Sequence, residues 1–305
     1  MRVGVTGAGG FIGSALVSTL AQRGDDIVTF VRPQSRPSPG LSVRWDPVHD
    51  QLDVGDLRRA GHLDAIVHLA GAGIGDRRWT TARRREILES RTASTRLLVH
   101  SLRELPEGAP FLASGSAVGY YGSRGDEILD EDSSPGDDFL ARVCREWERE
   151  AASLRDSGSR VATLRTGIVA SATGGALARQ LGLFRHGLGG PLGAGTQWIS
   201  PIALGDAVRA IMFVLDERVD GPVNLVAPCA VTNRDFTTAI ARAVNRRALL
   251  RVPAAALRLA LGRALTDGVV LASQRVAPKV LLESGFEFHA ADIDALLRSA
   301  LSPVS

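Results

Sequence analysis

The sequence contains one lysine, Lys279, and two tyrosines, Tyr120 and Tyr121, among its 305 residues. Arginine therefore supplies most of the positive charge, and 36 basic residues against 33 acidic ones give a net charge of +3. A nucleic-acid-binding protein would need its basic residues clustered on one surface. The densest basic run, residues 83–85, is followed by acidic residues, as on a solvated helix face. We therefore expect no nucleic-acid partner.

Cysteines and long apolar runs are also scarce. Cys144 and Cys229 are the only cysteines, and neither they nor the six histidines have the spacing of metal ligands. We therefore expect no disulfide, no metal site and a reducing compartment, the cytoplasm. The sequence has no run of about 18 or more apolar residues, so we expect no membrane span. The apolar N-terminus continues into a glycine turn, which favours a folded strand over a signal peptide.

Glycine is abundant near the N-terminus. Residues 3–6 predict a buried strand and residues 11–23 a helix, and Gly7, Gly10 and Gly13 stand at i, i+3 and i+6 between and within them. A missing Cβ allows a tight turn at the first glycine, close approach of a phosphate at the second, and helix–strand packing at the third. A strand, glycine turn and helix in this order predict a dinucleotide site, with the pyrophosphate at the helix N-terminus.

The residue after the second predicted strand, 27–31, distinguishes between the two nicotinamide cofactors. NAD sites usually place an acidic residue there, which binds the ribose 2′-hydroxyl. This chain has Arg32 instead, whose guanidinium can bind a 2′-phosphate through paired, charge-assisted hydrogen bonds. The cofactor predicted from these residues is NADP(H). The alternative for Arg32 is a solvated loop residue with no ligand.

Strands and helices alternate over the first 165 residues. Further strands are predicted at 42–45, 65–69, 110–114 and 160–164, helices at 80–105 and 138–154, and a surface loop at 33–40. This order predicts an α/β fold, a Rossmann-type doubly wound parallel sheet with right-handed crossovers. In such sheets, ligands bind outside the carboxyl ends of the strands.

The pattern changes after residue 165. Residues 167–195 are rich in glycine and predict an irregular, substrate-facing segment. Helices are then predicted at 203–215, 233–244, 254–261 and 293–301, and a strand at 223–226. We therefore predict an NADP-binding Rossmann domain over residues 1–165 and a smaller C-terminal α/β substrate or lid region over 166–305. The latter includes a small helical module at 250–300.

Several motifs resemble one known family. The glycine turn, His68–Gly71 and Ser114–Gly122 resemble the extended short-chain dehydrogenase/reductase superfamily, in its NAD(P)-dependent epimerase/dehydratase group. Segments 78–80, 164–169, 224–228 and 273–279 narrow the resemblance to an atypical epimerase-like subfamily that carries a small C-terminal module of unknown function. The resemblance covers essentially the whole chain. The chain departs from the expected pattern at Pro201 and Ala203, where we expect Trp and His.

The resemblance implies specific contacts. Together with the glycine turn and Arg32, it gives a set of candidate cofactor-binding residues: Gly7, Gly10, Phe11, Ile12, Gly13, Arg32, Leu69, Ala70, Gly71, Ser114 and Arg165. Ser116 matches the position that polarises a substrate carbonyl in the superfamily. The implied partner is a small-molecule substrate, sugar-like in the epimerases. Helices 80–105 and 138–154 are expected, by analogy alone, to form the interface of a homodimer.

The Tyr-x-x-x-Lys pair typical of the superfamily is missing. Its tyrosine exchanges the proton at the reacting oxygen, and its lysine lowers the tyrosine pKa. Phe139 stands where the tyrosine is expected, and Arg142, one turn on, has too high a pKa for proton transfer. Tyr120 and Tyr121 are the remaining tyrosine donors, although either could instead be an aromatic anchor.

Three functions stay open at this point. The first is an NADP(H)-dependent oxidoreductase that transfers hydride to or from a carbonyl or alcohol, with Ser116, Tyr120 and Tyr121 as catalytic candidates. The second is a non-catalytic NADP(H)-binding sensor or scaffold. The third is a sugar-nucleotide epimerase, which would retain its cofactor. The alternative for Ser116 is a hydroxyl that caps a loop, and for Arg165 a salt bridge in the crevice.

Overall fold

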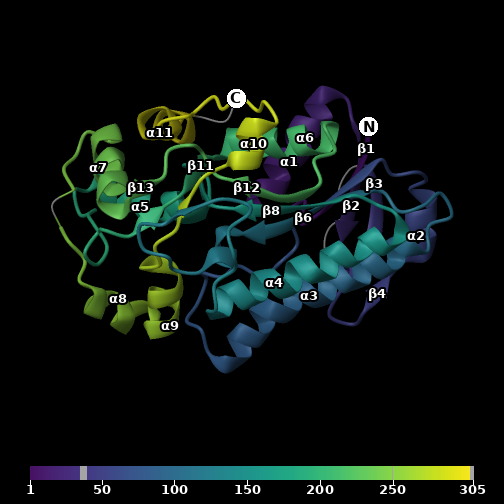
Figure 1. Cartoon of the computed structure of the whole chain (residues 1–305), viewed down its shortest axis with the longest axis horizontal. Coiled ribbons are helices and arrows are strands. Elements are labelled where there is room, and N and C mark those ends of the chain that lie inside the picture. Colours follow the sequence, from purple (N-terminus) through teal and green to yellow (C-terminus); the bar gives the residue numbers. More distant parts are fainter. Residues whose placement is uncertain (35–39, 249, 303–305) are drawn as a thin grey trace.

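The computed structural model describes residues 1–34, 40–248 and 250–302, and is built around one eight-stranded sheet (Figure 1). The strand order is β12-β8-β6-β5-β1-β2-β3-β4. The strands of this sheet are β1 (Arg2–Thr6), β2 (Asp26–Val31), β3 (Leu41–Asp46), β4 (Gln51–Leu52), β5 (Ala65–His68), β6 (Phe111–Ala117), β8 (Val161–Thr166) and β12 (Gly221–Leu225). The predicted loop at 33–40 falls mostly on residues outside the described ranges.

All neighbouring strands from β12 to β3 are parallel, and only the short β4 is antiparallel to its neighbour. The chain builds β1, β2 and β3 outwards in one direction and then returns to place β5 on the other side of β1. This confirms the predicted α/β, Rossmann-type sheet. The reversal of strand order at β1 and β5 opens a crevice at their carboxyl ends, where ligands bind in such folds.

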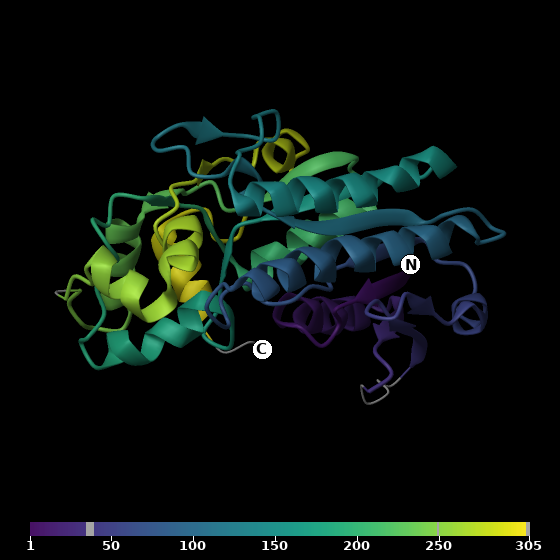
Figure 2. The ribbon, with the colours of Figure 1, turned by 90° about the horizontal axis from the view of Figure 1, so that it is seen from below.

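Helices cover both faces of the sheet (Figures 1 and 2). One face carries α1 (Phe11–Arg23), α6 (Leu204–Asp216) and α10 (Lys279–Glu283), and the other carries α2 (Val54–Arg59), α3 (Thr81–Arg103) and α4 (Phe139–Ala152). Two separate clusters of buried side chains fill the space between the sheet and these layers. Within the described residues, no helix is long and apolar enough to cross a membrane.

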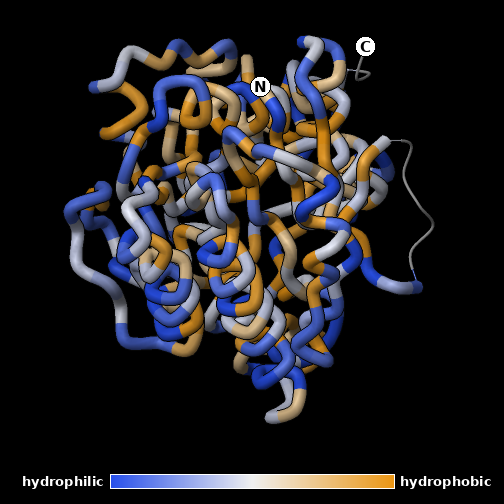
Figure 3. The backbone as a smooth tube through the Cα atoms, turned by 90° about the vertical axis from the view of Figure 1, so that its right-hand side faces the viewer, coloured by the Kyte–Doolittle hydropathy of each residue, from blue (hydrophilic) through white to orange (hydrophobic). Residues whose placement is uncertain are grey.

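Side-chain alternation along the strands explains the two cores. Val3 and Val5 point to the α1 and α6 side, where they join the cluster that contains Leu16 of α1. On β5, Ile66 points to the opposite face and joins the cluster that contains Leu98 of α3. The strands therefore read as continuous apolar runs, because both faces are covered. In Figure 3 hydrophobic stretches of the chain are orange and hydrophilic ones blue.

A third core lies beyond the carboxyl ends of the strands. It is built from α5 (Gly175–Arg185), α7 (Asn233–Ala243) and α11 (Ile293–Leu301), with β9 (Ile168–Ala170) and β11 (Pro201–Ala203). The segment 167–195, predicted to be irregular, therefore contains a strand and a three-turn helix. The other small elements are β7 (Ile128–Leu129), β10 (Trp198–Ile199), β13 (Val231–Thr232), β14 (Arg275–Val276), α8 (Ala254–Leu261), α9 (Arg263–Leu265), η1 (Val118–Tyr121), η2 (Ser153–Ser157) and η3 (Thr266–Val270).

The chain crosses between the two parts of the structure more than once. β12 and α6, which follow residue 165, return to the main sheet and complete it beside β8. A boundary between residues 165 and 166 divides the sequence, but residues on both sides of it contribute to the main sheet and its cores. Strand β12 pairs with β8 because a parallel sheet gains a further buried strand on that edge.

Candidate functional site

The glycine turn lies at the carboxyl end of β1, in contact with the end of β5. Gly7 has φ +68°, and a Cβ on it would lie 2.9 Å from the carbonyl of Leu69. A Cβ on Gly13 would lie 2.1 Å from the Gly7 carbonyl oxygen, which accepts a 2.8 Å hydrogen bond from the Gly10 amide. The first turn of α1 can therefore pack directly onto the strand end only because these positions are glycine.

The N-terminus of α1 carries no side-chain cap. Thr80 and Asp138 cap α3 and α4, whereas Gly10 caps nothing, and the first turn of α1 has no acidic residue. In the described part of the chain, the amides of Phe11, Ile12 and Gly13 donate to no protein acceptor. Free N–H groups and the positive end of the helix dipole together suit a phosphate.

The side chains of this first turn also connect the two parts of the molecule. The Phe11 ring packs against Gly174 and Gly175 at the start of α5, where a Cβ on Gly174 would approach it to 2.4 Å. Ile12 packs on the α1 face of the main core. The backbone of these two residues is therefore available to a ligand, while their side chains hold the helix in place.

Arg32 follows β2 directly and is exposed. Since Phe30 pairs with Thr6, Arg32 and the glycine turn are at the same edge of the sheet. Among the described residues, no carboxylate forms an ion pair with Arg32. Asp26 begins β2 at the opposite edge, so no acidic side chain occupies the place where an NAD site would have one.

The end of β5 is held to β1 by a buried polar network that sequence reasoning missed. Thr6 Oγ1 accepts hydrogen bonds from the amides of Leu69 (3.1 Å) and Ala70 (3.2 Å), and lies 2.7 Å from His68 Nδ1. The other ring nitrogen of His68 lies 3.0 Å from Thr95 Oγ1. Burial lowers the pKa of His68 to about 3, so the ring is neutral and positions the strand end. A polar residue in the apolar run of β1 was the signal for this network.

Two serines of β6 are both turned into the protein. Ser114 is fully buried, and its hydroxyl lies 3.4 Å from the Gly115 carbonyl, so its side chain does not reach the crevice. Ser116 donates a 2.6 Å hydrogen bond to Glu148 Oε1. A hydroxyl proton held by a carboxylate is not available to polarise a substrate carbonyl. The predicted role of Ser116 therefore does not fit this arrangement, in which Ser116 links β6 to α4, and the cofactor contact predicted for Ser114 would have to use its backbone.

Glu148 was not predicted from the sequence. It lies on the buried side of α4, one turn after Cys144, where the helical period places apolar residues. An acidic residue on that side was the available signal. Its two carboxylate oxygens accept from Arg165 Nε at 2.9 Å and Nη2 at 3.0 Å, in a bidentate pair.

Arg165 is a buried and paired cation, an arrangement that does not fit the cofactor contact predicted for it. It is 4% exposed, and beyond Glu148 its Nη1 donates to the Tyr121 hydroxyl at 3.1 Å and to the Glu131 carbonyl at 3.2 Å. Its Cζ lies 3.5 Å from the centre of the Tyr120 ring. Burial would lower the pKa of Arg165, but the pair with Glu148 outweighs this effect and raises it. The salt-bridge alternative is the one observed.

The two tyrosines have different surroundings. Tyr121 is fully buried and donates a 2.7 Å hydrogen bond to Asn224 Oδ1, and burial raises its pKa to about 12. It is an anchor and does not suit proton transfer. Tyr120 is partly exposed, and its ring meets that of Tyr121 edge-on at 5.3 Å. Of the two predicted tyrosine donors, only Tyr120 has exposed surface.

The positions of Lys279 and Phe139 do not allow the Tyr-x-x-x-Lys pair that is usual in the superfamily. Lys279 Nζ lies 2.6 Å from Asp132 Oδ2, in an exposed ion pair on the acidic loop formed by residues 126–132. At the start of α4, the Phe139 ring meets that of Trp79 edge-on at 5.3 Å. The pair forms an aromatic contact where a proton donor is usual. In the described ranges, no cluster of three or more His, Cys, Asp or Glu residues can hold a metal.

The loop after β5 connects the crevice with the C-terminal segment. Arg78 Nε donates a 3.0 Å hydrogen bond to the Ala260 carbonyl in α8, and Trp79 lies near Gly268. An open hollow of about 380 Å³ is lined by Gly125, Asp126, Gly193, Ala194, Thr196, Gln197, Ala254, Leu271 and Ser273. These contacts place α8, α9 and η3 against the Rossmann part.

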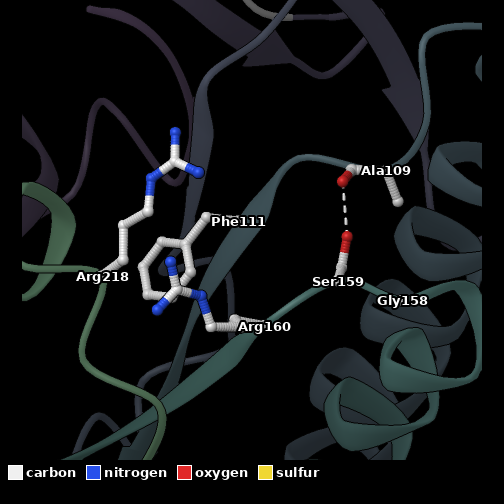
Figure 4. Close-up of a pocket in the computed structure, with 6 residues that line it drawn as sticks. All are labelled: Ala109, Phe111, Gly158, Ser159, Arg160 and Arg218. Atoms are coloured by element: carbon white, nitrogen blue, oxygen red, sulfur yellow. Dashed lines mark hydrogen bonds between the residues drawn. The ribbon is translucent and has the colours of Figure 1, made fainter.

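A second hollow lies at the wrong end of the sheet for a cofactor. It measures about 150 Å³ and is lined by Phe111, Arg160 and Arg218, among others (Figure 4). Strand β6 begins at Phe111 and β8 at Val161, so this hollow faces the amino ends of the strands. It is separate from the crevice described above.

Fold and site together define a Rossmann-type α/β protein with a glycine turn and an uncapped helix at the switch point of its sheet. The model of the NAD dependent epimerase/dehydratase family matches residues 3–227, and a domain of unknown function, DUF1731, matches residues 252–300. The chain belongs to the NAD dependent epimerase/dehydratase family. The resemblance noted in the sequence is thereby confirmed.

Individual relatives agree with this assignment. The chain is 39% identical over 288 residues to the epimerase family protein Mb2239 of Mycobacterium bovis, covering 94% of this chain and 93% of the relative. Human epimerase family protein SDR39U1, solved with NADPH, is 32% identical and has a TM-score of 0.88. The match covers 98% of this chain and 99% of the human chain. A nucleoside-diphosphate sugar epimerase from Corynebacterium glutamicum is 36% identical with a TM-score of 0.78, over 98% of this chain and 58% of that one.

Proposed function

We propose that this protein is an NADP(H)-dependent oxidoreductase that acts on a small carbonyl or alcohol substrate. The observation that carries the proposal is the uncapped N-terminus of α1 at the same sheet edge as Arg32. The human relative solved with NADPH supports the choice of cofactor. When bound, NADPH supplies the hydride, and the chain must bind, orient and shield it.

The residues present fit such a dinucleotide. The free amides of Phe11, Ile12 and Gly13 would hold the pyrophosphate, and Arg32 would hold the 2′-phosphate. Backbone groups of residues 69–71, fixed by Thr6, would line the path of the adenosine half. The first turn of α1 carries no acidic side chain that would oppose the pyrophosphate.

The network around Glu148 holds the other half of the crevice. Arg165 and Ser116 both bind this carboxylate, so β6, β8 and α4 are locked together at their crevice ends. Phe139 at the start of α4 and Trp79 in the loop before α3 add an edge-on aromatic contact. Tyr120 is the proton donor that we propose, because it is the tyrosine with exposed surface.

One set of observations favours a second function, NADP(H) binding without catalysis. The hydroxyls of Ser116 and Tyr121 are both donated to protein acceptors, and Lys279 is paired on the acidic loop. A sensor needs the cofactor cradle and does not need a free acid. Sugar-nucleotide epimerisation, by analogy with the Corynebacterium relative, would require that the purified protein retain its cofactor.

The homodimer also remains a proposal. The predicted interface is formed by α3 and α4, which pack side by side. None of the large apolar side chains exposed in the described residues belongs to either helix. Their outer surface instead carries ion pairs such as Arg96 with Glu150. A dimer through these helices would therefore be polar.

The test is to titrate the purified protein with NADPH and with NADH and to measure binding by the fluorescence emission of the bound nicotinamide. Arg32→Ser should weaken NADPH by about 10- to 100-fold, the value of one charge-assisted contact, and leave NADH unchanged. Arg85→Ser, an exposed arginine on α3, is the matched control and should change neither. A wild-type protein that does not bind NADPH, or prefers NADH, contradicts the proposal.

Catalysis is tested separately on a panel of aldehydes, ketones and oxo acids, by loss of NADPH absorbance. Turnover that falls at least tenfold in Tyr120→Phe supports the oxidoreductase with Tyr120 as donor. Turnover unaffected by that change removes Tyr120 from the mechanism. NADPH binding with no turnover on any substrate favours the sensor.

A further inference from the structure

Arg91 on α3 places its guanidinium at the crevice, between the ends of β5 and β6. Its Cζ lies 3.2 Å from the position of a Cβ on Gly71, just after β5. The same atom lies 5.2 Å from the centre of the Trp147 ring. That ring in turn lies 2.8 Å from the position of a Cβ on Gly115 of β6. The guanidinium is therefore fixed between two strand ends and is not free on the surface.

This cation has no acidic partner. Its Nη1 donates to the Ile87 carbonyl at 3.1 Å and to Ser90 Oγ at 3.4 Å, both in its own helix. No carboxylate oxygen in the described ranges lies within 4.0 Å of it. Among the described residues, the two arginines with the least exposed side chains, Arg83 and Arg165, both have carboxylate partners.

The surroundings make the missing partner costly. Arg91 is partly buried, and burial lowers its pKa. The indole Nε1 of Trp147 is buried and has no acceptor either. A partly desolvated cation beside a ring whose N–H donor is also unpaired leaves this part of the structure short of acceptors. Such a site is completed by a ligand that carries negatively charged oxygen.

We propose that Arg91 binds a carboxylate group of the substrate. This inference rests on the proposed function. The pyrophosphate belongs at the glycine turn after β1 and the 2′-phosphate at Arg32 after β2, whereas Arg91 lies between the ends of β5 and β6, on the other side of β1 from Arg32. The substrate class is therefore a carbonyl or alcohol compound that also bears a carboxylate, held by the guanidinium through paired hydrogen bonds.

Cofactor phosphate is the other source of the same oxyanion chemistry. The experiment therefore measures both, by calorimetric titration of the NADP⁺-saturated protein with oxamate and with its uncharged counterpart oxamide. The variants are Arg91→Met and Arg91→Lys. The matched control is Arg85→Met on the same helix, since Arg85 is exposed and paired with Glu89.

We expect wild-type protein to bind oxamate and not oxamide. Arg91→Met should weaken oxamate at least tenfold while NADP⁺ affinity stays within twofold, Arg91→Lys should recover part of the loss, and the control should match wild type. Without ligand, Arg91→Met should melt at or above the wild-type temperature, because the removed cation has no partner.

Several results would overturn the assignment. A tenfold loss of NADP⁺ affinity in Arg91→Met would give the guanidinium to a cofactor phosphate. Oxamate that binds all variants equally, or does not bind wild type, would exclude a carboxylate site, and a clear drop in melting temperature would show a structural cation. Failure of wild type to bind NADP⁺ contradicts the proposed function alone, and oxamate titration of the ligand-free protein still tests Arg91.

Discussion

Substitution of Gly13 by alanine tests whether the glycine turn positions the cofactor. A Cβ there would lie 2.1 Å from the Gly7 carbonyl oxygen and 2.9 Å from its carbon. Ordinary contact begins near 3.4 Å, so the turn must move by about 1.3 Å. The atom that must move is backbone, and it also accepts the Gly10 amide hydrogen bond. A flexible side chain cannot relieve this overlap.

The cost divides between stability and binding. Overpacking costs about 1–3 kcal/mol, and the better helix propensity of alanine returns about 1 kcal/mol. The variant should therefore fold. Displacement of the turn should break one or two amide–phosphate bonds, worth about 2–4 kcal/mol. This predicts an NADPH Kd raised roughly 30- to 1,000-fold.

The assay is fluorescence titration with NADPH, accompanied by urea unfolding to confirm that each variant is folded. Gly9→Ala is the matched control, because a Cβ on Gly9 meets no atom within 4 Å. It should change the free energy of unfolding by less than about 0.5 kcal/mol and the Kd by no more than about twofold. A folded Gly13→Ala protein that binds NADPH like wild type would refute the reasoning.

Two further predictions concern the buried charges. Arg165→Met should lower the free energy of unfolding, measured in urea, by about 3–5 kcal/mol, because it leaves Glu148 buried and unpaired. The double variant with Glu148→Leu should recover part of this loss. A much smaller loss of stability in Arg165→Met would contradict the network. Burial raises the pKa of Glu131 above its usual 4.5. Its ionisation therefore disfavours the folded state, and wild type should lose stability relative to Glu131→Gln as pH rises from 4.5 towards 8 in urea unfolding; a relative gain would show the opposite sign.

Much of the fold could be predicted because its signals are local. The helix predicted at 11–23 is α1, and its stop, Gly24, has φ +87° as a C-terminal cap. The helices predicted at 254–261 and 293–301 also have the observed bounds. The prediction of an irregular segment at 167–195 was wrong, because this glycine-rich stretch contains a helix whose apolar side packs on α7 and α11. That packing, and not propensity, stabilises α5.

The candidate site was predicted less well than the fold. The glycine turn and Arg32 share one sheet edge, as the strand order required. Ser116 and Arg165 were expected to face ligands, but both bind Glu148, a residue whose sequence position gave only a faint signal. Arg91 was not singled out, because in the sequence it is one of many arginines.

The sequence by itself determined the order of strands and helices, the glycine turn and the absence of a Tyr-x-x-x-Lys pair, since each depends on neighbouring residues or on composition. Only the tertiary structure decided which polar groups are engaged and which are free. Tyr121 meets Asn224 across 103 positions of the chain, whereas Arg91 meets no carboxylate in the described residues. Burial and pairing arise from contacts between distant segments, so no local pattern can report them.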